Sequence, residues 1–182
     1  MLLLKVNEHV FMRMLSARDA LPLYHLIDES RDSLITWLPW LDKINSEEDA
    51  LQYIKDTILS FQHHHSITAG IWLKEQLVGM IAYYDMDFEN RIGHIGYWLG
   101  EKYQGRGIMT ESVTKMINYG FYDLSLNRIE MRISSDHLVC LRIPRKLGFK
   151  EEGCIRQAQL LNGHYVDHII FGLLRCEWTN SN

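Results

Sequence analysis

The sequence has few cysteines, no long apolar run and no repeated or low-complexity segment. Its three cysteines, Cys140, Cys154 and Cys176, are odd in number and too few for a disulfide framework, which favours a reducing compartment. The apolar run at residues 1–4 is too short for a signal peptide or a membrane span. We therefore expect a cytoplasmic protein without a membrane anchor.

Charge of one sign is not in excess either. Charged residues make up 23% of the chain and hydrophobic residues 47%, which is typical of a globular protein rather than a disordered one. A net charge of −4 gives no basis for general binding to nucleic acids or to anionic membranes. No linker rich in Pro, Gly or Ser interrupts the chain, so we expect a single domain over residues 1–182.

Hydrophobic periodicity predicts strands that alternate with amphipathic helices. The expected strands cover residues 10–15, 67–73, 77–84, 92–99 and 128–133, and a final hairpin joins 149–160 to 164–174. The expected helices cover residues 19–30, 46–61, 110–121 and 138–147, although Pro144 is unfavourable inside the last of them. This order predicts an α/β fold, in which a mixed, mostly antiparallel sheet carries helices on both faces.

A glycine-rich turn between a strand and a helix is the most informative motif. The segment Gln104-Gly105-Arg106-Gly107 follows the strand at 92–99 and leads into the next helix. Glycine lets the backbone approach a ligand closely or take a positive φ at little steric cost, and the free N–H groups of the first helical turn favour negative charge. The turn therefore suits a pyrophosphate, with Arg106 as a charged clamp. Taken alone, Gly-x-Gly also fits an ordinary tight turn.

The longer context resembles the GCN5-related N-acetyltransferase superfamily. Its signature, Gln/Arg-x-x-Gly-x-Gly/Ala, corresponds here to Gln104-x-x-Gly107-x-Met109, so the last small residue is missing. The chain looks most like the subfamily that acetylates the N-termini of ribosomal proteins, over roughly residues 8–178. Further matching pieces are Arg13, Ile95-Gly96-Tyr97-Trp98, Leu147-Gly148-Phe149, Glu152-Gly153-Cys154, Leu161-Asn162-Gly163 and Glu177-Trp178.

This resemblance implies a binding site for acetyl-CoA, used as a cosubstrate without a metal. In the family the fourth and fifth strands splay apart, and the pantetheine arm of CoA lies between them; here these are the strands at 92–99 and 128–133. The residues assigned to CoA binding are Tyr97, Trp98, Leu99, Gln104, Gly105, Arg106, Gly107, Ile108, Met109, Thr110 and His137. One backbone N–H beside the thioester would stabilise the oxyanion. For the side chains of Tyr97 and Trp98, packing in the sheet core is the competing interpretation.

The catalytic residues are less well defined, because the chain departs from the subfamily at several positions. His137 and Cys140 stand where the subfamily has Asn and Ser, and the Ser is a candidate acid for the leaving sulfur. Cys140 is thus either a proton donor or a small apolar filler. Where the subfamily has two acids, this chain has His94 and Gln159. His94 is the candidate general base, since an imidazole titrates near neutrality and strand alternation places it on the face of Gly96. The competing interpretation is a polar strand residue, with water carrying the proton.

The adjacent histidines at 63–65 point in different directions and predict no metal site. The aromatic segment at 37–41 is interpreted as a buried plug, with a substrate wall or a dimer contact as alternatives.

We expect direct transfer of acetyl from acetyl-CoA to an amine in a ternary complex. The leading acceptor is the N-terminal α-amine of a protein, and a ribosomal protein is the candidate that the resemblance implies. The alternatives are a small-molecule amine acetyltransferase and a catalytically silent CoA-binding module. The protein is expected as a monomer or a homodimer, and fold alone does not identify the acceptor.

Overall fold

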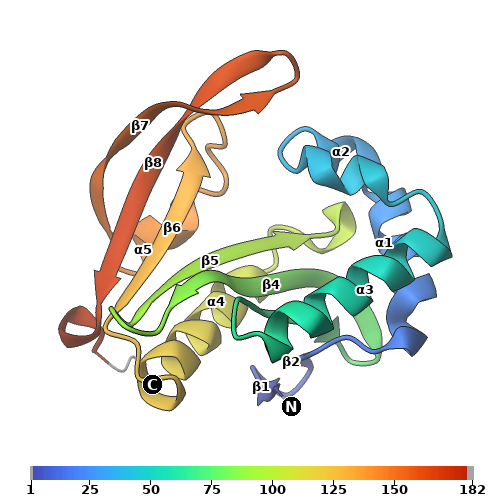
Figure 1. Ribbon diagram of the computed structural model, residues 1–182, viewed down its shortest axis with the longest axis horizontal. Coiled ribbons are helices and arrows are strands. Elements are labelled where there is room, and N and C mark those ends of the chain that lie inside the picture. Colours follow the sequence, from blue (N-terminus) through green and yellow to red (C-terminus); the bar gives the residue numbers. More distant parts are fainter. Residues whose placement is uncertain (1, 180–182) are drawn as a thin grey trace.

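The computed structural model describes residues 2–179, and its centre is one eight-stranded sheet (Figure 1). Every neighbouring pair of strands is antiparallel except β5 and β6, which are parallel. The mixed, mostly antiparallel sheet expected from the sequence is therefore confirmed. In sheet order the strands are β1 (Leu3–Lys5), β2 (Val10–Arg13), β3 (Ile67–Leu73), β4 (Gln76–Asp87), β5 (Ile92–Leu99), β6 (Arg128–Ser134), β8 (His164–Leu174) and β7 (Lys150–Leu161).

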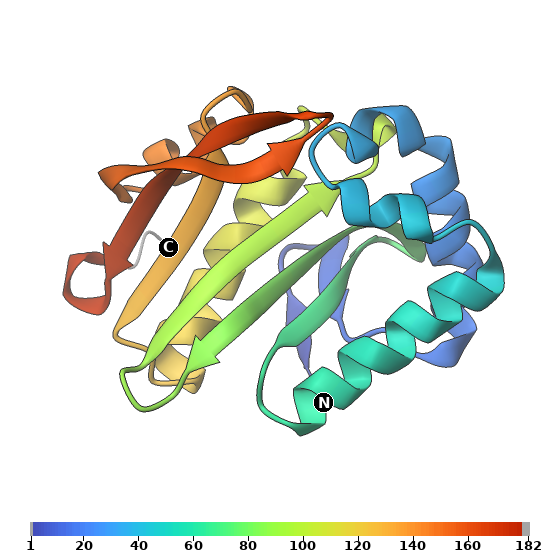
Figure 2. The same cartoon turned by 45° about the horizontal axis from the view of Figure 1, so that its top comes forward.

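Helices lie on both faces of the sheet. The α-helices are α1 (Ala20–Glu29), α2 (Arg31–Ile35), α3 (Glu47–Gln62), α4 (Ile108–Asn118) and α5 (Arg142–Lys146). Figures 1 and 2 show α1 and α3 in front of the sheet and α4 behind it. The start of α3 follows from its sequence, because Ser46 Oγ accepts a hydrogen bond from the Asp49 N–H at 3.1 Å. None of the helices in the described part of the chain has the length and apolarity that crossing a bilayer requires.

Strand alternation determines which side chains face α4. Ile129 and Met131 of β6 are fully buried, and Ile129 lies next to Gly120, just beyond the end of α4. Tyr83 of β4 points the same way, since its hydroxyl donates to the Met116 carbonyl of α4 at 3.0 Å. Because alternate residues face opposite sides, Glu130 and its β6 neighbours two residues away lie on the front face.

The sheet splits in its centre. β5 and β6 are paired only where residues 92–94 of β5 meet residues 128–130 of β6. Beyond these residues the strands diverge, as Figure 2 shows. This confirms the splayed central strands. The split leaves backbone N–H and C=O groups of both strands without sheet partners, and such groups need another ligand.

The element boundaries differ from expectation at several places. α4 begins at Ile108, two residues earlier than predicted, and the predicted helix at 138–147 shrinks to α5. Pro144 explains the shorter helix: it is the third residue of α5, where a backbone N–H has no acceptor within the helix. The short β1 and α2 were not expected, since neither segment is long enough to show a clear periodicity.

Candidate active site

The glycine turn has the conformation that the sequence predicted. Gly105 and Gly107 have φ angles of +72° and +81°, in the left-handed region that favours glycine. Gly107 is the N-cap of α4, and no side chain caps the helix there. The first N–H groups of α4 are therefore free to bind an anion. Gln104 fixes the turn to the preceding strand, because its side-chain amide donates to the Leu99 carbonyl at 3.1 Å.

The side chains of the turn divide between the surface and the core. Arg106 is exposed, whereas Ile108 and Met109 are buried. The missing small residue of the family signature is thus explained: the Met109 side chain packs into the core instead of filling the space above the turn. The backbone amides of the turn remain accessible to a ligand.

Tyr97 and Trp98 face opposite sides of β5. Trp98 is 8% exposed and belongs to the core, so the packing interpretation holds for its side chain. The hydroxyl of Tyr97 is buried and has no hydrogen-bond partner within residues 2–179. Burial raises the pKa of Tyr97, and the neighbouring Cys140 raises it further. A neutral phenol that lacks a partner therefore lies near Cys140 on the strand that borders the split.

His137 and Cys140 lie together in the loop between β6 and α5. The Cys140 N–H donates to His137 Nδ1 at 3.3 Å, and the Cys140 sulfur lies 3.3 Å from His137 Nε2. Burial raises the pKa of the Cys140 thiol to about 11 and lowers the pKa of His137, so both groups are neutral at pH 7. The raised pKa makes Cys140 a poor nucleophile, because the thiolate is the reactive form.

The aromatic segment at 37–41 reaches this loop. The ring of Trp37 lies 4.1 Å from the ring of His137, centroid to centroid. Leu41 is fully buried, as a plug requires, but Trp40 is 38% exposed and stacks on Tyr53. The prediction of a buried plug is therefore correct for only part of the segment.

His94 lies where the sheet splits. Its Nδ1 lies 3.2 Å from the Asp85 carbonyl, and its Nε2 lies 3.1 Å from Glu130 Oε2 (the ring atoms that donate depend on the tautomer). The register pairs His94 with Tyr84 of β4, and the two rings stack 5.5 Å apart. Asp85 has a φ of +46° in an irregular part of β4, and this turns its carbonyl toward the imidazole. Both ring nitrogens thus face oxygen acceptors, an arrangement that an imidazolium satisfies completely.

Glu130, which the sequence interpretation did not single out, is the carboxylate partner of His94. Its Oε1 accepts from Arg128 Nε at 2.8 Å, and Arg128 also binds Glu152 of β7. Burial would raise the pKa of Glu130, but the hydrogen bond from Arg128 and the charges of Arg128, His94 and Arg132 hold it below its ordinary value. Glu130 is therefore ionised at neutral pH. Alternation of polar and apolar residues along β6 was the only signal for it in the sequence.

Gln159 stands where the family resemblance predicts an acid, and it has a polar partner on the neighbouring strand. Its side-chain carbonyl lies 2.9 Å from His168 Nε2 on β8. Burial lowers the pKa of His168, and the positive charge of Arg132 lowers it further. Gln159 and His168 are therefore an uncharged pair on the neighbouring strands.

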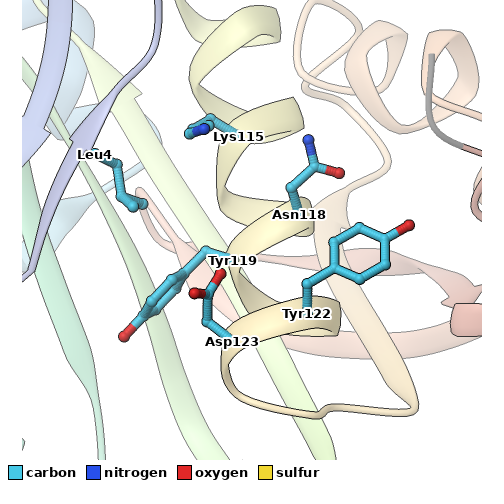
Figure 3. Close-up of a pocket in the computed structure, with 6 residues that line it drawn as sticks. All are labelled: Leu4, Lys115, Asn118, Tyr119, Tyr122 and Asp123. Atoms are coloured by element: carbon cyan, nitrogen blue, oxygen red, sulfur yellow. The ribbon is translucent and has the colours of Figure 1, made fainter. Parts of the chain in front are cut away.

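A surface pocket lies at the far end of α4 from the glycine turn. Figure 3 shows the side chains that line it: Leu4, Lys115, Asn118, Tyr119, Tyr122 and Asp123. It contains none of the residues assigned to CoA or to catalysis. Residues 2–179 hold no group of three or more His, Cys, Asp or Glu side chains placed to bind a metal.

The fold and the site together define an acetyltransferase. Residues 9–150 match the acetyltransferase (GNAT) domain family, and the chain belongs to this family. It is accordingly an enzyme, and within the family it belongs with the RimJ/RimL-type proteins.

Two relatives and one solved structure illustrate the similarity. YdaF of Bacillus subtilis (strain 168), whose name classes it provisionally as a ribosomal N-acetyltransferase, is 33% identical over 96% of each chain. The ribosomal-protein-serine acetyltransferase of Escherichia coli (strain K12) is 28% identical over 90% of this chain and 92% of its own. The microcin C7 self-immunity acetyltransferase MccE, solved with acetyl-CoA and AMP, is 26% identical and superposes with a TM-score of 0.89 over 93% of this chain and 94% of its own.

Proposed function

We propose that this enzyme transfers acetyl from acetyl-CoA to the N-terminal α-amine of a protein, with a ribosomal protein as the leading acceptor. The observation that carries the proposal is the split between β5 and β6, which runs from the glycine turn to the His94–Glu130 pair. The names of the two relatives support the acceptor class. We place the reaction in the cytoplasm, where the three free thiols stay reduced.

The chain offers suitable groups for the pyrophosphate and for the pantetheine arm of CoA. The free N–H groups from Gly105 to Thr110 would hold the pyrophosphate, with Arg106 as an exposed cation beside them. The open part of β5, residues 95–99, is about 13–16 Å long at roughly 3.3 Å per residue, and its backbone groups on the edge that faces β6 suit the pantetheine amides. The unpartnered Tyr97 hydroxyl fits a ligand in this split, since a buried donor without an acceptor is unfavourable.

The activated acetyl group of the thioester supplies the electrophile, and the chain must supply proton transfer. The α-amine of a protein arrives mostly protonated at pH 7, because its reference pKa is about 7.7–8.0. The ionised Glu130 would attract the ammonium group, and His94 would take one proton from it first, because only the neutral amine has a lone pair for attack. The second proton leaves the nitrogen as the tetrahedral intermediate collapses and goes to the departing CoA thiolate. The Asp85 carbonyl and the Glu130 carboxylate then stabilise the imidazolium, because each accepts one of its two N–H groups.

Two neutral hydrogen-bond donors, the Cys140 thiol and the Tyr97 hydroxyl, also lie near the split. The His137 Nδ1 accepts a backbone N–H, so in the neutral ring Nε2 carries the proton and faces the Cys140 sulfur. This arrangement leaves the Cys140 S–H free to donate to the departing sulfur, with the Tyr97 hydroxyl as a second donor. With a pKa of about 11, Cys140 acts here as a hydrogen-bond donor more than as a strong acid.

A small-molecule amine is the second candidate acceptor. The similarity to the microcin C7 self-immunity acetyltransferase supports it, because that enzyme was solved with AMP beside acetyl-CoA. An acceptor screen with detection of released thiol separates the two candidates. We expect turnover with peptides that carry a free α-amine and little with peptides whose only amine is lysine. Turnover confined to small amines would reject the protein acceptor.

A further inference from the structure

Arg132 is a weakly paired cation at the split. Its side chain is 44% exposed, and Nη2 lies 3.5 Å from both His94 Nε2 and Glu130 Oε2. Both of these contacts are at the outer limit of a hydrogen bond. Within residues 2–179 the guanidinium makes no shorter polar contact.

The nearby acids are already engaged with other partners. Glu130 Oε1 binds Arg128 at 2.8 Å, and Glu130 Oε2 lies closer to His94, at 3.1 Å, than to Arg132. Glu152 is bound by Arg128. Where the subfamily has an acid near the final turn, this chain has the uncharged Gln159. Arg132 is therefore the more weakly paired of the two arginines in the cluster.

Arg132 also lies centrally on the front face of the sheet. Its charge influences groups on both sides of β6: burial lowers the pKa of His168 on β8 and Arg132 lowers it further, whereas on β4 burial raises the pKa of Tyr84 and Arg132 opposes that rise. A guanidinium that is half exposed and weakly paired binds carboxylate and phosphate groups well, because its N–H groups form a planar fork.

We propose that Arg132 selects acceptors that carry an anionic group close to the reactive amine, and that this group is an acidic side chain in the first two residues of a protein N-terminus. The geometry limits the distance between the reactive amine and the anionic group. An amine about 3 Å from His94 Nε2 and a carboxylate about 3 Å from Arg132 Nη2 are separated by at most about 9.5 Å, because these two nitrogens lie 3.5 Å apart. The inference rests on the proposed acetylation of N-terminal amines at this site.

Three peptides that differ only at the second residue test the inference: Ser-Asp, Ser-Asn and Ser-Lys. For the wild-type enzyme we expect kcat/KM for Ser-Asp to exceed that for Ser-Asn by about 10- to 100-fold, mainly through KM, as a charge-assisted pair implies. In Arg132→Gln the ratio should fall to about 1, and Arg132→Glu should reverse the preference toward Ser-Lys. Arg156→Gln, at an exposed arginine of β7 outside the cluster, should retain the wild-type ratio.

Each result decides one question. A wild-type enzyme without preference, or an Arg132→Gln variant that is slower with all three peptides at an unchanged ratio, would overturn the role of Arg132. The reversed preference of Arg132→Glu keeps the test valid if Arg132→Gln is partly destabilised. The amides of aspartate and asparagine provide a small-molecule arm. If only these are acetylated, and Arg132→Gln removes the preference for aspartate amide, the protein acceptor is rejected but anion selection by Arg132 stands.

Discussion

Replacing Gly105 with alanine should weaken CoA binding while leaving the protein folded. Gly105 has a φ of +72°, and a Cβ atom built on it meets no protein atom within 4 Å. The only cost to the free protein is the left-handed conformation, about 1–2 kcal/mol for a residue with a Cβ. Most domains retain a positive free energy of unfolding after such a loss, because their total is about 5–15 kcal/mol.

The effect on CoA binding should be larger than the effect on folding. The added methyl group would occupy the space in which the pyrophosphate approaches the backbone, and at least one hydrogen bond to a charged oxygen would be lost. Such a bond contributes about 1.5–3 kcal/mol, so the Kd should rise by about 10- to 100-fold.

The structure provides a matched control at Gly148, which follows α5. It has a φ of +80°, and its Cβ would also meet no atom within 4 Å. Gly148→Ala should therefore lose a similar free energy of unfolding in urea but keep the wild-type Kd for CoA by calorimetry. If both variants bind CoA as the wild type does, or if both lose affinity equally, the glycine turn is not the pyrophosphate site.

Three further predictions concern catalysis, thiol reactivity and stability. His94→Ala should lower kcat by roughly 10²–10⁴-fold with little change in CoA affinity, and His94→Gln should be as slow if His94 is the direct base; steady-state kinetics that show near wild-type rates for both variants would contradict this. In the native enzyme, Cys140 should react with iodoacetamide about 100-fold more slowly than a thiol of pKa 9.0, because its pKa is about 11; mass spectrometry that finds it modified as fast as the exposed Cys176 would refute the burial argument. Asp19→Asn removes the carboxylate that binds Arg13 at 2.7 Å and should cost about 1.5–3 kcal/mol in urea unfolding at pH 7. Burial would raise the pKa of Asp19, but hydrogen bonds from Arg13 and Ser16 hold it low, so the wild-type advantage should shrink as the pH falls below about 4; a difference that is independent of pH would contradict it.

Local sequence signals identified most elements and the conformation of the glycine turn. The glycine turn depends on residues that are neighbours in the chain, and its two glycines have the predicted positive φ angles. The predicted strands also form one sheet, because alternation of polar and apolar residues directly reflects burial on one face. The split between β5 and β6 was predicted from the family resemblance alone, since the sequence of neither strand shows where its pairing with the other ends.

The partners of His94 could not be predicted from the sequence. Glu130 is 36 residues away in the chain, and it reaches His94 only because the parallel register of β5 and β6 places them side by side. The direction of the Asp85 carbonyl depends on an irregularity in β4. An aspartate in the sequence does not signal a positive φ as strongly as a glycine does. Such contacts are tertiary, and periodicity carries no information about them.

Locating the acetyl group on a peptide that has both a free α-amine and a lysine tests the central claim most directly. Wild-type enzyme, acetyl-CoA and this peptide should give one acetyl group on the α-amine by tandem mass spectrometry, in equal amount to the thiol released. Acetylation on the lysine side chain, or release of thiol without acetylated peptide, would contradict the assignment of this enzyme to protein N-termini.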